Sequence, residues 1–129
     1  MNNFVTHLEC SEAGDHYNFA EINNLSKINK PLLVKYDLEK LKNSFSKEDF
    51  INDFASLPGV WKYQYLLPLS KKSSVINLGE VITPLVRISK SNNLFIKDEG
   101  RLPTGSFKAR GLALGVARAK ELGIKSSEL

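Results

Sequence analysis

The sequence predicts an α/β protein in which a small β-segment is followed by helices and an incomplete βα(β) unit. Short apolar runs in a polar, turn-rich stretch up to about residue 36 are typical of strands, and helical spacing begins at Asp37. A strand-like run at 94–97 precedes a long helical pattern, as in the first two-thirds of a βαβ unit. Because only "IKSSEL" remains after Gly123, we expect other residues, in a larger protein, to complete the sheet.

The composition is that of a soluble globular protein. Of the 129 residues, 42% are hydrophobic and 25% are charged, and no run of about 18 apolar residues or signal-like start is present. Cys10 is the only cysteine, so no internal disulfide can form, and we expect a cytoplasmic protein with no membrane partner. The net charge is +4, but the lysines are scattered rather than clustered with aromatics, which argues against a nucleic-acid partner.

Residues 1–36 form the first expected domain. The runs "HYNF" and "PLLVKY" predict two or three short strands, joined by Gly14-Asp15 and by the loop "NNLSKINKP". A β-segment of this size is too small to fold alone, so we expect it to rely on the second domain, residues 37–129.

The second domain is expected to begin with two helices, in "DLEKLKNSF" and "SKEDFINDFASL". Ser46 and Asp49 resemble a capping box, and Pro58-Gly59 ends the second helix. Its apolar face carries residues at i, i+4 and i+7: Phe50, Phe54 and Leu57. The run "VWKYQYLLPL" fits both a strand and a helix, and we favour a short helix before Pro68.

A turn at Asn92-Asn93 and a strand at 94–97 lead to the clearest element, the helix in "SFKARGLALGVARAKELG". We expect its N-cap at Thr104 or Ser106 and its C′ residue at Gly123. Gly111 and Gly115 share one face with Ala119 and Leu122, and each glycine costs about 1 kcal/mol relative to alanine in a helix. We therefore expect another element to approach this face closely.

Lys108 stands in the first turn of this helix, where the helix dipole opposes a cation by about 0.3–1 kcal/mol. A phosphate-binding P-loop would explain a lysine here, but Ser106-Phe107 replaces the Lys-Ser or Lys-Thr that such a loop needs. A destabilised ammonium would instead provide a nucleophilic amine, able to form a Schiff base with an aldehyde. An ordinary solvated lysine stays open as well, although the position of Lys108 beside the two helical glycines predicts that it points towards a packed layer.

The stretch "KDEGRLPTGSFKARG" contains Lys108 and is preceded along the chain by three further motif-like segments. It resembles the lysine signature, approximately "GxNPTGSFKxRG", of the threonine synthases, which are pyridoxal-phosphate (PLP) enzymes of the tryptophan-synthase-β (fold type II) group. "PLLVKYDL", "VWKYQYLLPL" and "LGEVITPLVR" match three further family segments in the same order. The similarity extends from about His7 to Gly123.

The resemblance implies that this chain is the N-terminal portion of a fold type II enzyme, with a degenerate zinc-ribbon-like β-segment at 1–36 and an incomplete catalytic domain at 37–129. Lys108 would carry PLP and move protons on the substrate, and Ser106 and Phe107 would lie beside the cofactor ring. The family is a lyase of threonine biosynthesis that converts O-phospho-L-homoserine and water to L-threonine and phosphate. The resemblance leaves open whether the protein is a homodimer.

Several positions depart from the family pattern. Val81-Ile82 replaces a glycine and a polar residue, and Leu102 replaces an asparagine. Relatives often carry two cysteine pairs in the ribbon, whereas here Cys10 is accompanied by Ala13, Ser26 and Ile28. The remaining candidate zinc ligands are His7, Cys10 and His16. Their spacing matches no known pattern and zinc needs about four ligands, so we expect no metal.

The family's phosphate-cradling glycine-rich loop lies C-terminal to its lysine and is not found after Gly111. We therefore expect the 129-residue chain alone to be inactive. Two alternatives remain: a sibling PLP enzyme, such as a threonine dehydratase or a cysteate-synthase-like enzyme, and a non-catalytic remnant module. The ribbon together with "LGE…TPL" argues against the plain dehydratases.

Overall fold

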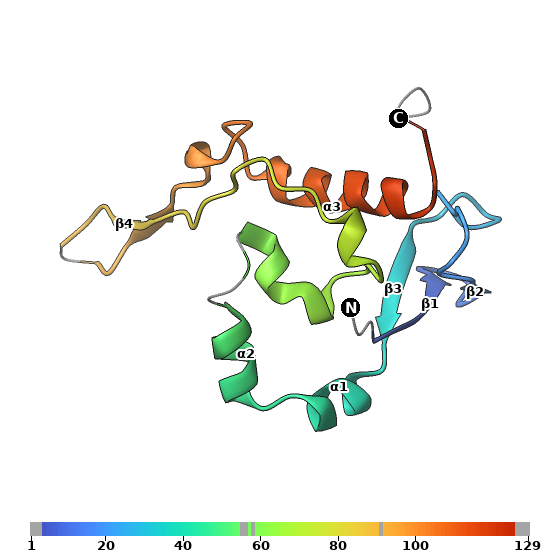
Figure 1. Ribbon diagram of the computed structural model, residues 1–129. Helices are drawn as coiled ribbons and strands as arrows, with labels where there is room; N and C mark the ends of the chain where they lie inside the picture. The colour runs from blue at the N-terminus through green and yellow to red at the C-terminus, as the bar shows by residue number, and fades with distance from the viewer. Residues whose placement is uncertain (1–3, 55–56, 58, 91, 126–129) are drawn as a thin grey trace.

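Figure 1 shows the computed structural model, which describes residues 4–54, 57, 59–90 and 92–125. The strands are β1 (Val5–Cys10), β2 (His16–Tyr17), β3 (Leu32–Tyr36), β4 (Leu85–Arg87) and β5 (Phe95–Lys97). The α-helices are α1 (Leu38–Ser44), α2 (Lys47–Phe54) and α3 (Lys108–Glu121), and the 3₁₀ helices are η1 (Gly59–Leu66), η2 (Lys72–Ser74) and η3 (Glu99–Arg101). This mixture of helices and strands is consistent with the predicted α/β class. No helix in the described ranges has the length and apolar character needed to cross a membrane.

The N-terminal segment folds into a three-stranded antiparallel sheet with the strand order β2-β1-β3. Leu8 in the central strand pairs with Tyr17 on one side and with Val34 on the other. Gly14, in the turn between β1 and β2, has a φ of +72°, a left-handed conformation that glycine adopts without steric cost. The prediction of short strands at "HYNF" and "PLLVKY" is confirmed, and β1 is the third strand.

Both helices predicted after the first domain are present, each with a side chain capping its N-terminus. The Asp37 carboxylate accepts a hydrogen bond from the Lys40 N–H at 2.8 Å. At α2 the Asp49 N–H donates to the Ser46 hydroxyl at 3.1 Å, and the Ser46 N–H donates to the Asp49 carboxylate at 3.0 Å. This reciprocal pair confirms the predicted capping box.

Most of the predicted apolar face of α2 lies outside the described part of the structure. This applies to the side chains of Phe50 and Phe54 and to Pro58, where the helix was expected to end. Leu57, the third residue of that face, is half-buried and packs against the main core.

The main core joins η1 and the chain after it to one face of α3. Trp61 and Leu69 are 1% and 0% exposed and cluster with Ala113 and Ala117 of the helix. The indole N–H of Trp61 donates to the Ile76 carbonyl at 2.7 Å, so this buried polar group is paired. The run "VWKYQYLLPL" is therefore helical, as favoured, but in 3₁₀ rather than α geometry.

The predicted C-terminal helix is α3, which begins at Lys108. Phe107 occupies the N-cap position and makes no side-chain capping bond, so the prediction of Thr104 or Ser106 as the N-cap is wrong. The Ser106 hydroxyl still accepts a hydrogen bond from the Lys108 N–H at 3.3 Å. Gly123 follows the helix with a φ of +77°, which confirms the predicted C′ glycine.

The predicted glycine face of α3 is open at Gly111 and Gly115, although Ala119 on the same face is buried. A Cβ added at Gly111 or Gly115 would meet no heavy atom within 4 Å. The alanines that pack in the core are instead Ala113 and Ala117, and Ala109, one turn earlier on the same side of the helix, is also buried. Lys108 is exposed, so the prediction that it points towards a packed layer is wrong for the described residues, because the alanines and not the glycines meet the core.

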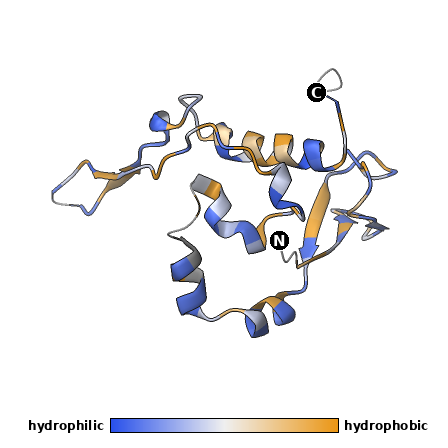
Figure 2. Cartoon of the chain, viewed as in Figure 1, coloured by the Kyte–Doolittle hydropathy of each residue, from blue (hydrophilic) through white to orange (hydrophobic). Residues whose placement is uncertain are grey.

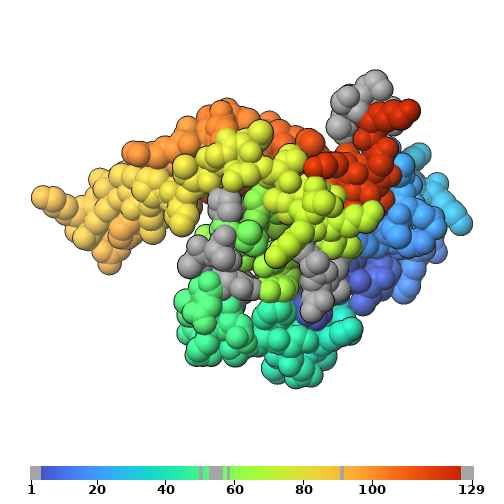
Figure 3. All heavy atoms as spheres, viewed as in Figure 1, coloured from blue at the N-terminus to red at the C-terminus, as the bar shows by residue number. Residues whose placement is uncertain are grey.

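Strands β4 and β5 form an antiparallel hairpin that projects from the rest of the molecule (Figures 1 and 3). Leu85 pairs with Lys97, Arg87 pairs with Phe95, and every residue of both strands is exposed. Asn93, in the connecting loop, has a φ of +41°, which agrees with the predicted turn. The strand predicted at 94–97 is confirmed, but within the described ranges it pairs only with β4 and forms no parallel sheet against α3. Figure 2 shows that both strands of this projecting hairpin carry hydrophobic residues.

The open glycine face predicts a gain in stability on substitution. Gly111→Ala should raise the free energy of unfolding of this chain by about 0.5–1 kcal/mol, because alanine restricts the unfolded chain and its methyl group meets no neighbour. Ala113→Gly, on the buried face of the same helix, is the matched control and should lower stability by about 1 kcal/mol or more. Urea denaturation measures both. A destabilising Gly111→Ala would show that another surface covers this face in solution.

Candidate functional site

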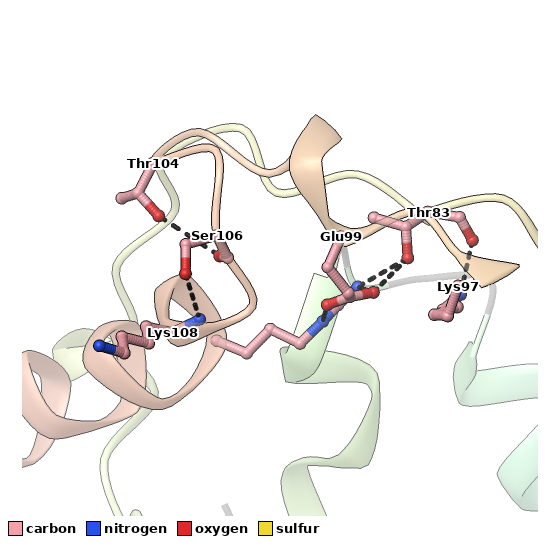
Figure 4. A network of polar contacts seen from close by, with 7 residues as sticks. Thr83, Lys97, Glu99, Thr104, Ser106 and Lys108 are labelled. Carbon is pink, nitrogen blue, oxygen red and sulfur yellow. Dashed lines mark hydrogen bonds and ion pairs between the residues drawn. The ribbon is translucent and has the colours of Figure 1, made fainter.

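Two of the segments quoted above, "LGEVITPLVR" and "KDEGRLPTGSFKARG", meet in one polar cluster, which Figure 4 shows in part. Thr83 comes from "LGEVITPLVR", Glu99 begins η3, and Arg110 lies in the first turn of α3. The Glu99 carboxylate accepts hydrogen bonds from the Thr83 hydroxyl at 2.5 Å and from Arg110 Nε and Nη2 at 2.6 and 3.0 Å. Arg110 Nη2 also donates to the Thr83 hydroxyl oxygen at 3.2 Å, so the three side chains form a closed Thr83–Glu99–Arg110 cluster.

The electrostatics of the cluster keep Glu99 ionised. Hydrogen bonds from Arg110, and secondly from Thr83, lower the pKa of Glu99 to about 2. The same Glu99 carboxylate raises the pKa of Arg110. A two-pronged guanidinium–carboxylate pair also fixes the relative orientation of its partners. Glu99 is therefore unsuited to donate a proton near neutral pH, and we interpret the cluster as a clamp between the hairpin and the start of α3.

The base of the hairpin is joined to the same cluster. Thr83 is 2% exposed, and its carbonyl accepts a hydrogen bond from Lys97 Nζ at 2.5 Å (Figure 4). The Asp98 N–H donates to the Pro84 carbonyl at 3.0 Å. These bonds hold the exposed hairpin in place at its base, where it has no sheet to support it.

Glu80, in "LGEVITPLVR", lies against the start of η1. It is 5% exposed, and its carboxylate accepts a hydrogen bond from the Leu78 N–H at 3.1 Å. A Cβ at Gly59 would lie 2.7 Å from the Glu80 Cβ, and Gly59 has a φ of +59°. Both the close approach and the backbone conformation require glycine here.

The turn before α3 is closed by backbone hydrogen bonds. The Gly105 N–H donates to the Leu102 carbonyl at 2.7 Å, and the Ala109 N–H donates to the Ser106 carbonyl at 3.1 Å. Leu102, which departs from the asparagine of the family signature, is 3% exposed. Its apolar side chain therefore serves packing in this chain.

The predicted site residues lie together at the end of this turn. Lys108 is the first residue of α3, Phe107 is 66% exposed, and Ser106 is half-buried. In Figure 4 the Lys108 side chain extends away from Thr83 and Glu99. The structure thus brings the three residues together on one exposed turn, while their roles towards a cofactor stay predictions.

A cavity of about 210 Å³ lies beside the Thr83–Glu99–Arg110 cluster, and Lys108 is not among the residues that line it. Its lining includes Tyr63, Val81, Ile82, Thr83, Lys97 and Arg110. Ligand pockets usually measure about 300–1,000 Å³, so this cavity is small. Val81 and Ile82, which depart from the family motif, contribute apolar side chains to a wall that also contains Lys97 and Arg110.

Sequence analysis assigned no role to Thr83, Glu99 or Arg110, although all three stand in the quoted segments. The available signal was the pairing of an acidic residue before the lysine signature with an arginine two residues after the lysine. Pairing across 11 and 16 residues in sequence depends on the fold, so spacing alone could not reveal it.

Comparison with known proteins identifies the relatives of this chain. A threonine synthase from Methanocaldococcus jannaschii is 36% identical over 122 residues, which is 90% of this chain and 29% of the relative. One from Methanosarcina acetivorans is 37% identical over 127 residues, 93% of this chain and 30% of the relative. The sequence matches the N-terminal portion of threonine synthases. A threonine synthase from a Bacillus species is 45% identical over 67 residues, about half of this chain.

The chain spans 29% and 30% of the lengths of the first two threonine synthases. No family model and no solved structure matches it significantly. The resemblance expected from the four quoted segments is confirmed at the level of sequence.

The cluster predicts how stability depends on pH. The pKa of Glu99 falls from 4.5 to about 2 on folding, so its stabilising contribution is complete above about pH 4.5 and is lost as the pH falls through about 2. Glu99→Gln should therefore lower stability at pH 7 and flatten its decline between pH 4.5 and 2, as measured by urea denaturation across this range. Asp98→Asn, next to it and paired with exposed Arg101, is the control. An unchanged pH profile in Glu99→Gln would contradict the clamp.

Proposed function

We propose that this chain is the N-terminal part of a threonine-synthase-like, PLP-dependent lyase. The complete enzyme would act on O-phosphates of amino acids, converting O-phospho-L-homoserine and water to L-threonine and phosphate. The observation that carries the proposal is the 36% identity to a threonine synthase across 90% of the chain. The exposed turn that presents Lys108 supports it, since an amine there is accessible to a small aldehyde.

The proposal includes a division of the chain. Residues 1–36 would be a degenerate zinc-ribbon-like segment, which the antiparallel sheet β2-β1-β3 supports. Residues 37–129 would be the N-terminal part of a fold type II catalytic domain. The exposed hairpin and the open glycine face of α3 support this, because both leave apolar surface for the remainder of such a domain to cover. We place the complete enzyme in the cytoplasm and leave room for a homodimer.

The residues present fit the aldehyde end of PLP. Lys108 offers an exposed primary amine, and Phe107 beside it offers an exposed aromatic ring. When bound, PLP acts as an electron sink for bond cleavage at the amino-acid substrate. Among the described residues we identify no glycine-rich loop for its phosphate, so phosphate binding would fall to the remainder of the enzyme.

Each of these residues would have a separate role at the site. Lys108 would hold the cofactor through its amine and later move a proton between its Nζ and the substrate. Phe107 and Ser106 would orient the ring, the latter through the turn that its hydroxyl closes with the Lys108 N–H. Arg110, two residues further on, would position Lys108 through its pair with Glu99 rather than touch the substrate.

Reductive labelling tests the assignment of Lys108. With PLP and borohydride, the 129-residue chain should gain one phosphopyridoxyl group, and mass spectrometry should find it on the peptide that contains Lys108. Lys108→Arg should remove this label. Lys120→Arg, which changes an exposed lysine on the same helix, should leave it unchanged. Labels spread over many lysines, and equal in Lys108→Arg, would contradict a special reactivity of Lys108.

Activity distinguishes the proposed lyase from its alternatives. The 129-residue chain alone should release no threonine or phosphate from O-phospho-L-homoserine, because the phosphate-binding loop is absent from its described part. A chain of full threonine synthase length with this N-terminal sequence should do so, and Lys108→Ala should lower its kcat by at least a hundredfold. Turnover of threonine or of a sulfite acceptor instead would indicate a dehydratase or a cysteate-synthase-like sibling. A full-length chain that binds no PLP would indicate a non-catalytic module.

A further inference from the structure

Three side chains of types that can bind a metal ion gather on one face of the N-terminal sheet, away from the Lys108 turn. His7 and Glu9 are two residues apart on β1 and therefore share a face, and His16 on β2 is the cross-strand partner of Glu9. Glu9 Oε2 lies 3.9 Å from His7 Nε2 and 3.7 Å from His16 Nε2. One ligand atom from each of the three residues falls within 4.8 Å of the other two.

One of these atoms is a buried nitrogen without a partner. Nδ1 of His7 lies 2.9 Å from the Thr6 hydroxyl, and that hydroxyl donates its proton to the Lys35 carbonyl at 3.2 Å. The hydroxyl oxygen must then accept from Nδ1–H, which places the ring proton on Nδ1 and a lone pair on Nε2. His7 Nε2 is buried and has no hydrogen-bond partner among the described residues. Metal-binding histidines are commonly held in this way, by a hydrogen bond at the nitrogen that does not bind the metal.

The carboxylate is oriented in a similar manner. Glu9 Oε1 accepts a charge-assisted hydrogen bond from Lys35 Nζ at 2.9 Å, which leaves Oε2 facing the two histidines. Two imidazole nitrogens and a carboxylate oxygen thus converge on one point, where a cation could bind between them.

The spacing suits a small tetrahedral cation. Ligand atoms about 2.0–2.1 Å from a tetrahedral zinc ion are roughly 3.3 Å apart, a few tenths of an ångström less than the two distances to Glu9 Oε2. The two imidazole rings lie 3.9 Å apart between centroids at 31°, and the three ligand atoms lie within 4.8 Å of one another, so they would move closer together on binding an ion. Two histidines and one glutamate are a known zinc ligand set that keeps a fourth position for water.

We propose that His7, Glu9 and His16 bind one divalent transition-metal ion, with Zn²⁺ as the ion of best fit. This departs from the sequence-based expectation of no metal, which rested on ligand spacing that included Cys10. Cys10 is one residue from Glu9 and faces the opposite side of the sheet, where it is 2% exposed and accepts a hydrogen bond from the Ala13 N–H. Glu9 therefore replaces Cys10 as the third candidate ligand beside the two histidines.

The ion would join β2 to β1. Strand β2 contains only two residues and pairs with β1 at Leu8 and Glu9. A bound metal ion would stabilise so small a sheet, because an ion that binds only the folded state shifts the unfolding equilibrium towards that state. The metal would have a structural role that is independent of the proposed PLP chemistry.

Isothermal titration of ZnCl₂ into the EDTA-treated 129-residue chain tests the site. We expect one ion per chain and a higher melting temperature with Zn²⁺. His16→Gln should weaken binding at least tenfold and is expected to fold, since the His16 side chain is 63% exposed. Glu9→Gln should weaken it as well. Two matched controls should bind normally: Glu12→Gln, which changes a carboxylate paired with Lys30, and Cys10→Ser on the opposite face.

Three results would overturn the proposal: no heat of binding, an unchanged affinity in His16→Gln, or loss of binding in Cys10→Ser. The last would assign zinc to the thiol. Circular dichroism of each variant without metal confirms that the sheet is retained, and a variant that has lost it is replaced by His7→Gln. The phosphopyridoxyl label on Lys108 should be the same with and without zinc.

Discussion

The packing of Ala113 and Ala117 of α3 against Trp61 and Leu69 organises the rest of this structure. Alanine side chains let the helix backbone approach the indole ring closely, and the indole N–H is paired with Ile76 in the same layer. Because this face is turned inwards, the neighbouring face with its two glycines is turned outwards, and Lys108 with it. The orientation of the helix therefore follows from the size of its side chains.

The Thr83–Glu99–Arg110 cluster is the second constraint, because it attaches the β4–β5 hairpin, which lies outside the hydrophobic core, to the start of α3. The β4–β5 hairpin has no buried residue in either strand, so little hydrophobic burial holds it. Charge-assisted bonds from Arg110 to Glu99 attach its base to the first turn of α3. The exposed turn that carries Ser106, Phe107 and Lys108 is thereby held between the packed helix and this clamp.

In the N-terminal sheet, the two faces of strand β1 carry different kinds of side chain. Alternation along β1 directs His7 and Glu9 to one face and Leu8 and Cys10 to the other. Cys10 is thus buried as a small apolar group, while His7 and Glu9 face His16. Packing and polar contacts therefore fall on opposite sides of the same strand.

Local signals were sufficient for most elements of this protein. The capping box at Ser46 and Asp49, the left-handed Gly123 and the length of the last helix depend on neighbours in sequence, and each formed as predicted. Three features could not be read locally: the inward face of α3, the antiparallel partner of β5, and the grouping of Glu9 with the two histidines. Each is set by contacts between residues far apart in the chain, where burial and strand register decide which side chains meet.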